Sequence, residues 1–136
     1  EINRIDAGIV TQACFALSLG RPREDVEKMY KFCEELYPYT LEQLEKKRTF
    51  IEIDVDLNER IHKAGYELNT PHIHLYNLSY AMPMQSPPLP GDFFTVHPNC
   101  CNKEYTAGAK FGDAVRITKE GKVERLNKVP AKLNIV

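Results

Sequence analysis

Hydrophobic positions in the first third of the chain recur at the spacing of an amphipathic helix. Residues 5–17 repeat apolar side chains every three or four positions, and Gly20 follows as a stop signal. Residues 22–36 repeat the same spacing, with charged side chains on the opposite face. The pattern predicts that residues 4–47 are helical.

Prolines and a capping pattern set the expected ends of these helices. Pro22 lies where the first turn of a helix accepts proline. Pro38 is expected to end that helix, because proline lacks the amide donor that the helix interior needs. Thr40 and Gln43 match a capping box, which predicts one more short helix, ending near residue 47.

The hydrophobic period changes from about 3.6 to 2 after this region. The segment TFIEIDVDL, residues 49–57, alternates apolar and acidic side chains and predicts a strand with one solvated face. A hairpin is predicted over residues 113–126, with Glu120 and Gly121 in a two-residue turn. The other predicted strands are residues 72–80, 92–97 and 131–136.

A helical region followed by strands is typical of the α+β class. We therefore expect one domain over residues 1–136, helical over 4–47 and strand-rich over 49–136. The strands are expected to form a mostly antiparallel sheet or a small open barrel. A chain of 136 residues can bury about two thirds of its surface without disulfides or a metal.

The segment of residues 70–101 is almost free of charge. It contains one charged residue, Asp92, together with six of the nine prolines and three of the four histidines. Proline cannot pair in a central strand, so part of this segment is expected to be an extended loop. Its tyrosine, methionine and phenylalanine side chains indicate order, packed against the core, another subunit or a ligand.

Two histidines of this segment are expected on one face of a strand. His72 and His74 are two positions apart, which places their α-carbons roughly 6.6 Å apart on a strand. With His97 and Cys100 they form a possible ligand set for zinc or another divalent metal. The alternative is that the histidines pack or form hydrogen bonds in a polar groove.

Two known protein families have metal-binding motifs that are similar to this arrangement of histidines. His72, His74 and His97 match the order of the cupin metal motif, but its glutamate and framing glycines are absent. The segment PHIHLYN is similar to the metal-binding strand of the His-hydrophobic-His nucleases. The nearest downstream tyrosine, Tyr105, lies in a segment without a helical pattern, so neither family is assigned.

Two further chemistries remain open. Cys100 or Cys101 near His97 could form a cysteine nucleophile, which would need a positive and partly open setting. The three acidic residues of segment 49–57 could bind a cation if they share a strand face. A solvated outer face explains the same acidic pattern.

Charge and cysteine usage limit the class of protein. The formal net charge is −1, which does not favour a nucleic-acid partner. Residues 69–136 carry 8 basic and 5 acidic side chains, a net +3 that suits an anionic ligand near Lys110 or Arg116. No apolar run approaches the roughly 18 residues of a membrane span. Four cysteines without a spaced framework predict a soluble cytoplasmic protein with reduced thiols.

From these patterns we expect a non-catalytic binding module, in which residues 70–101 form a subunit contact and line a pocket. The expected partners are a second copy of the chain, giving a homo-oligomer, and a small molecule, for which the basic side chains of residues 69–136 favour an anionic one. The expected ligand-binding residues are His72, His74, Tyr76, Tyr80, Phe94, Lys110 and Arg116. The alternatives are a metal-dependent enzyme using the His-x-His set and an accessory subunit of a larger assembly.

Overall fold

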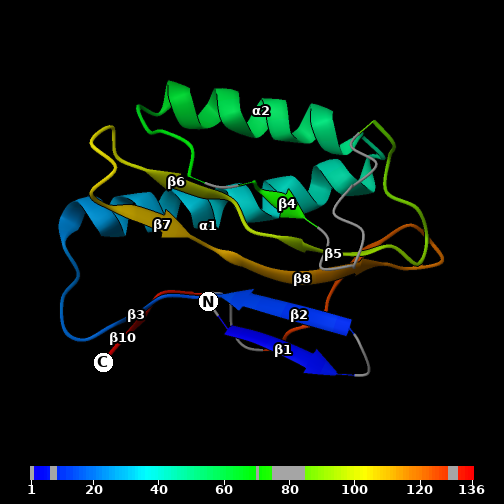
Figure 1. Ribbon diagram of the computed structural model, residues 1–136, viewed down its shortest axis with the longest axis horizontal. Coiled ribbons are helices and arrows are strands. Elements are labelled where there is room, and N and C mark those ends of the chain that lie inside the picture. Colours follow the sequence, from blue (N-terminus) through cyan, green and yellow to red (C-terminus); the bar gives the residue numbers. More distant parts are fainter. Residues whose placement is uncertain (1, 7–8, 70, 75–84, 129–131) are drawn as a thin grey trace.

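The computed structural model describes residues 2–6, 9–69, 71–74, 85–128 and 132–136, with side chains from residue 11 onward. Within these residues, two helices pack on a curled antiparallel sheet (Figure 1). The expected α+β class is confirmed.

The main sheet has six strands in the described residues. Five follow the order β1-β2-β8-β5-β4, and β9 pairs with β8. Their bounds are Ile2–Asp6 for β1, Ile9–Cys14 for β2, Ile73–His74 for β4, Phe93–Val96 for β5, Gly112–Ile117 for β8 and Val123–Arg125 for β9. All pairings in this sheet are antiparallel, as expected.

Two small sheets lie beside the main one. The strands β6 (Asn99–Cys101) and β7 (Gly108–Lys110) pair antiparallel. The strands β3 (Leu17–Ser18) and β10 (Asn134–Ile135) pair parallel, which brings residues near the two ends of the chain together. The predicted last strand is therefore present.

The helix predicted over residues 5–20 is wrong, because β1, β2 and β3 occupy this region. Helical spacing here is coincidental. Leu17, a member of the apolar stripe, is 66 % exposed. The segment is rich in β-branched residues, which favour strands when a sheet is available to pair with.

Helix α1 (Glu24–Glu45) continues through Pro38, where the sequence predicts an end. The ring of Pro38 is exposed, and buried side chains before and after it hold one long helix on the core. Thr40 does not cap a new helix, because its hydroxyl donates to the carbonyl of Leu36 at 2.7 Å. Burial of the side chains before and after Pro38 offsets the loss of one backbone hydrogen bond at the proline, which otherwise costs about 3 kcal/mol.

Helix α2 (Phe50–Lys63) replaces the strand predicted over residues 49–57. Thr49 and Glu52 form a reciprocal capping box that begins the helix. The buried side chains recur at helical spacing and are Phe50, Ile53, Leu57 and Ile61. Ile51 and Val55 belong to the alternating pattern but are 43 % and 50 % exposed.

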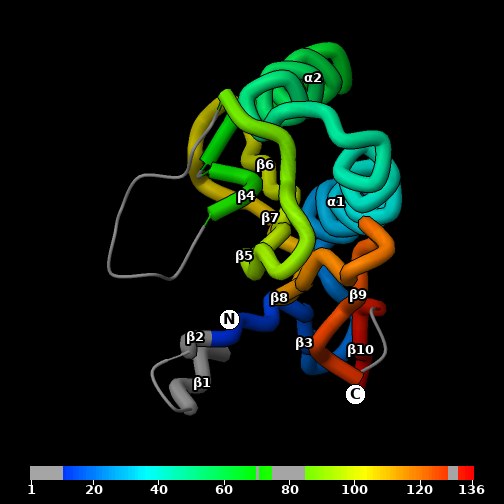
Figure 2. Tube along the Cα trace, turned by 90° about the vertical axis from the view of Figure 1, so that its right-hand side faces the viewer, coloured from blue at the N-terminus to red at the C-terminus, as the bar shows by residue number. Residues whose placement is uncertain are grey.

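Both helices lie on the same side of the sheet (Figures 1 and 2). The ring of Phe50 packs edge-on against Phe94 at 5.2 Å between centroids, and Val96 and Val115 join the same core. These strand residues therefore face the helices. Because successive side chains of a strand alternate, their neighbours Thr95, His97 and Ala114 face away from the helices.

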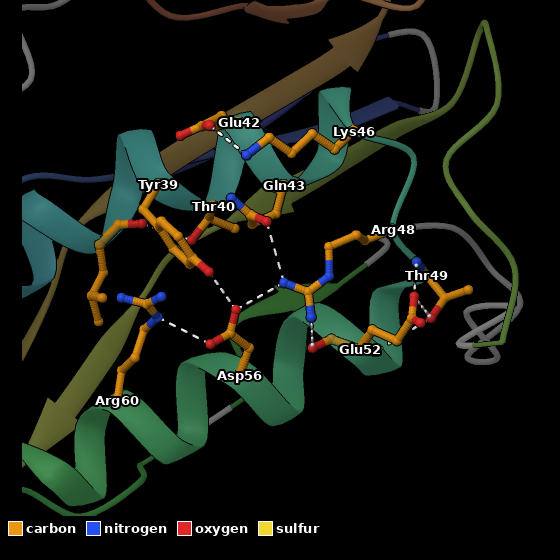
Figure 3. Close-up of polar contacts among 11 residues, drawn as sticks. Tyr39, Thr40, Glu42, Gln43, Lys46, Arg48, Thr49, Glu52, Asp56 and Arg60 are labelled. Carbon is orange, nitrogen blue, oxygen red and sulfur yellow. Dashed lines mark hydrogen bonds and ion pairs between the residues drawn. The ribbon is translucent and has the colours of Figure 1, made fainter.

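An ion-pair network joins the two helices (Figure 3). Asp56 of α2 accepts hydrogen bonds from Tyr39 of α1, from Arg48 at 2.8 Å and from Arg60 at 3.0 Å. Burial alone would raise the pKa of Asp56, but these donors hold it below its ordinary value. The carboxylate thus fixes how α2 lies along α1.

The predicted hairpin is present between β8 and β9. Its turn has three residues instead of two, since Thr118 accepts the amide of Gly121 and pairs with Lys122. Gly121 has φ 78°, the left-handed conformation that glycine adopts without strain. Neither helix combines the length and hydrophobicity of a membrane span in the part of the chain that the structure describes.

Candidate functional site

A polar strip crosses the sheet on the face away from the helices. Thr95 pairs with Ala114 of β8 on one side and with His74 of β4 on the other. Gln12 adjoins this row, because its neighbour Ala13 pairs with Asp113. We call Gln12, Thr95, His74 and His97 the polar strip.

Two histidines meet at one end of the polar strip. The Nε2 atoms of His74 and His97 lie 2.6 Å apart, and their ring centroids are 4.6 Å apart. His97 is almost fully buried, and His74 is half-buried. A neutral imidazole carries one donor and one acceptor nitrogen, so a bond between two Nε2 atoms holds a proton between the rings.

Two buried oxygens of the polar strip lack a hydrogen-bond partner among the described residues. They are Oε1 of Gln12 and Oγ1 of Thr95, on side chains that are 3 % and 1 % exposed. Each buried polar atom of this kind lowers the stability of the fold by about 1–3 kcal/mol, because it has lost its hydrogen bonds to water without gaining a partner. We call these two oxygen atoms the orphaned oxygens. Because both lie in the polar strip, a ligand there could supply the missing hydrogen bonds.

His72 does not share a hollow with His74, contrary to the sequence-based expectation. Its Nε2 lies 3.0 Å from Oδ1 of Asn58 on α2, and its Nδ1 lies 3.2 Å from Nδ2 of Asn99. His72 precedes β4 in a bend, so strand alternation does not govern its direction. Burial lowers the pKa of His72, with only partial opposition from Asp54, so the ring is neutral and structural.

Cys100 is also directed away from the polar strip. Its Sγ lies 3.6 Å from Sγ of Cys33 on α1, inside the core. Of the four expected metal ligands, only His74 and His97 meet. Among the residues that the structure describes, no group of three or more histidine, cysteine or acidic side chains could hold a metal ion.

The cysteine-nucleophile alternative does not fit the geometry either. Cys100 and Cys101 are both buried, and the sulfur of Cys101 lies 3.5 Å from the carbonyl of Glu67. Burial raises the pKa of Cys101, which disfavours its thiolate; the hydrogen bond with Cys33 lowers the pKa of Cys100, but that sulfur is enclosed in the core and is not open to a substrate. The acidic residues of segment 49–57 lie on α2, where Glu52 caps the helix and Asp56 binds two arginines.

The remaining expected ligand-binding residues do not gather at the polar strip. Phe94 is fully buried against the helices, and Arg116 is exposed and pairs with Glu124 at 2.7 Å. Lys110 lies on β7 in a different sheet. Tyr76 and Tyr80 lie outside the described residues.

Sequence reasoning missed Gln12 and Thr95. Thr95 had a usable signal, since it lies two positions before His97 on a predicted strand and so shares its face. Gln12 had none, because its place depends on the pairing of β2 with β8 across about 100 residues.

This fold is found in peptide-cleaving enzymes. The structure is similar to a dipeptidase from Pyrococcus horikoshii OT3, with a TM-score of 0.77 and 21 % sequence identity over 93 % of this chain and 37 % of that chain. It is also similar to the dipeptidase PepE from Mycobacterium ulcerans, with a TM-score of 0.68 and 20 % identity over 93 % of this chain and 35 % of the other. No protein-family model matches the chain, and no curated protein sequence matches it.

These similarities correct the expectation of a non-catalytic binding module. Both neighbours are dipeptidases, so the finding favours the alternative of an enzyme. The chain spans little more than a third of the length of each neighbour. The expected homo-oligomer and the expected lack of a nucleic-acid partner stay predictions.

Proposed function

We propose that this chain takes part in the hydrolysis of short peptides, with His74 and His97 at the reaction centre. The observation that carries the proposal is the fold, which matches dipeptidases over 93 % of the chain. The hydrogen-bonded imidazole pair on the polar strip supports it, because imidazole is the side chain most often used for proton transfer near neutral pH.

The reaction needs proton transfers that an imidazole pair supplies. A neutral ring nitrogen accepts a proton from water as the water oxygen bonds to the peptide carbonyl carbon. The carbon–nitrogen bond then breaks, and the same proton passes to the leaving amine. The second ring holds the first in orientation and shares the charge that develops on it.

A divalent metal is not part of this mechanism. Catalytic zinc is normally held by three protein side chains, whereas the polar strip offers two imidazoles and two neutral oxygens. The described residues therefore do not form such a centre by themselves. The mechanism is written with the imidazoles alone.

The test is cleavage of a dipeptide panel by the purified chain, followed by mass spectrometry. The panel is run with chelator and, separately, with added zinc or manganese. Wild-type protein is expected to release free amino acids, and His97→Ala is expected to lose about 10²–10⁴-fold in rate. His62→Ala is the control, because His62 is exposed on α2.

Two results would overturn the proposal. One is that no dipeptide is cleaved under either metal condition. The other is that His74→Ala and His97→Ala both retain the wild-type rate while remaining folded by circular dichroism.

We further propose that the protein works in the cytoplasm. All four cysteines are free thiols, including two whose sulfurs lie 3.6 Å apart, which suits a reducing compartment. Fractionation of cells that express the tagged protein tests this location.

A further inference from the structure

The two orphaned oxygens of the polar strip have complementary hydrogen-bonding chemistry. The Oε1 atom of Gln12 accepts hydrogen bonds and cannot donate them. The Thr95 hydroxyl can donate to a carbonyl oxygen. A ligand that satisfies both atoms therefore carries an N–H donor and a carbonyl acceptor, as every peptide main chain does.

Their spacing suits a short extended peptide. Gln12 lies on β2 and Thr95 on β5, with β8 between them, so the two residues are roughly 10 Å apart. An extended chain advances about 3.3 Å per residue, so this distance corresponds to two or three residues. Ala114, which pairs with Thr95 on the intervening strand, has a side chain of one carbon, so it presents no bulky or polar group between Gln12 and Thr95.

The charge of the strip favours a main chain over a metal ion. Asp113, the carboxylate of β8, points to the other face, where it binds Tyr37 and is 2.7 Å from Arg125. Gln12 and Thr95 are neutral. A neutral amide pays a smaller desolvation penalty at such buried atoms than an ion does.

Thr95 is also close to the proposed reaction centre. It pairs directly with His74 on the neighbouring strand and lies two positions before His97 on the same face. A carbonyl bound by its hydroxyl is therefore next to the imidazole pair, while Gln12 contacts a more distant part of the same ligand.

We propose that Gln12 and Thr95 are the positioning residues for the peptide main chain: Thr95 donates to the reacting carbonyl and Gln12 accepts from an N–H group roughly two residues away. This rests on the proposed function. Both oxygens lie below the surface, so the peptide displaces the atoms that cover them.

The test measures binding and cleavage separately. L-alanyl-L-alanine is titrated into isotope-labelled protein, and NMR shifts report binding while signals of free alanine report cleavage. Thr95→Val and Gln12→Leu remove the orphaned oxygens at nearly constant volume. Thr40→Val is the matched control, because the buried Thr40 hydroxyl already donates to Leu36.

We expect Thr95→Val and Gln12→Leu to bind the dipeptide at least tenfold more weakly. Both variants should melt at the wild-type temperature or above it, since an unsatisfied buried group is removed. Thr40→Val should bind normally and melt lower. If Gln12→Leu does not fold, Gln12→Met replaces it in the same comparison.

The outcomes separate this inference from the proposed function. If both variants bind the dipeptide more weakly but the wild type cleaves no dipeptide, the main-chain contacts of Gln12 and Thr95 are supported and the proposed peptide hydrolysis is contradicted. If the wild type cleaves the dipeptide but both variants bind it with unchanged affinity, the positioning role of Gln12 and Thr95 is contradicted and the proposed peptide hydrolysis is supported. A wild-type protein that does not bind the dipeptide overturns both.

Discussion

The Nε2 atom of His74, on β4, lies 2.6 Å from the Nε2 atom of His97, which directly follows the neighbouring strand β5. The residues are 23 positions apart in sequence. A bond this short makes the two rings one proton-holding unit, so neither ring keeps its role without the other.

Substitution of the two histidines should therefore be strongly non-additive. His74→Ala and His97→Ala are each expected to lower the rate of dipeptide cleavage by about 10²–10⁴-fold. The double variant should lose no more than about threefold beyond the worse single variant, as residues that act as a unit do. Steady-state kinetics measure the three rates. If the rate losses of the two single variants multiply in the double variant, the two histidines do not act as one unit.

Gly112 is expected to tolerate no side chain. A Cβ atom there would lie 1.9 Å from the carbonyl oxygen of Val96 and 2.7 Å from the Cα of His97. Gly112→Ala must push β8 away from β5 and should lower the free energy of unfolding by more than about 3 kcal/mol in urea titrations.

Gly121→Ala is the matched comparison for that variant. Gly121 has φ 78°, and no heavy atom would lie within 4 Å of its Cβ. It should lose only about 1–2 kcal/mol, from the left-handed backbone alone. Equal losses at the two glycines would show that the close approach of β5 and β8 is not what Gly112 provides.

Stability should fall as the pH is lowered, through His72. Burial places the pKa of His72 in the folded protein below its unfolded value of about 6.5. The unfolded chain then binds the proton first, so the contribution is complete above about pH 6.5 and is lost as pH falls through the folded pKa. Melting temperatures from pH 7.5 to pH 5 measure this loss.

His72→Gln is expected to flatten that pH dependence, because it keeps a polar side chain near Asn58 and Asn99 without a titrating group. His62→Gln, at an exposed position, should leave the slope as it is in the wild type. If the melting temperature of the His72 variant falls with pH as steeply as that of the wild type, other groups cause the pH dependence.

Oxidation should join Cys33 to Cys100. Their sulfurs lie 3.6 Å apart in the reduced protein, and two thiols with one hydrogen peroxide give a disulfide and two water molecules. The hydrogen bond between the two sulfurs raises the pKa of Cys33 and lowers the pKa of Cys100, so Cys100 is the thiol expected to react with peroxide first. Peptide mapping after peroxide treatment should find this linkage ahead of any involving Cys14.

The disulfide would close a loop between residues 67 positions apart and could stabilise the protein by up to about 4 kcal/mol. The melting temperature of oxidised wild type should rise, and Cys33→Ser should abolish the rise. A linkage that forms only in denaturant would contradict the geometry.

Asp56 should contribute more to stability than a typical surface carboxylate. Asp56→Asn weakens bonds from Tyr39, Arg48 and Arg60 together, and is expected to lower the free energy of unfolding by about 1–3 kcal/mol. Asp25→Asn, at an exposed pair with Arg23, should leave the urea midpoint unchanged. Equal effects would show that the network does not hold the helices together.

The strands that sequence patterns located correctly are those whose signals are local. The β8–β9 hairpin has alternating runs around a glycine, and β5 follows a proline-rich stretch with a compact apolar run. In residues 49–57 two periods coexist. The capping box of Thr49 and Glu52 favours the helix, and that local signal should have outweighed the alternation of Ile51 and Val55.

The site could be predicted only in part. His74 and His97 were both candidates, because an imidazole on a strand near another histidine is visible in sequence. The wrong partner, His72, came from assuming strand geometry at a residue that lies in a bend and is held by Asn58 and Asn99. The remaining part, Gln12, depends on the neighbours of β2 in the sheet, which no local pattern encodes.

The order of strands in the main sheet has a consequence for synthesis. The strand β2 leaves the ribosome roughly 100 residues before its partner β8, which corresponds to about 5–20 s of translation. Until then the β1–β2 hairpin lacks β8 at the edge of β2, so that edge is open. The nascent chain is thus exposed to wrong pairing or chaperone capture during this interval, and variants that slow translation between β2 and β8 should increase the aggregated fraction.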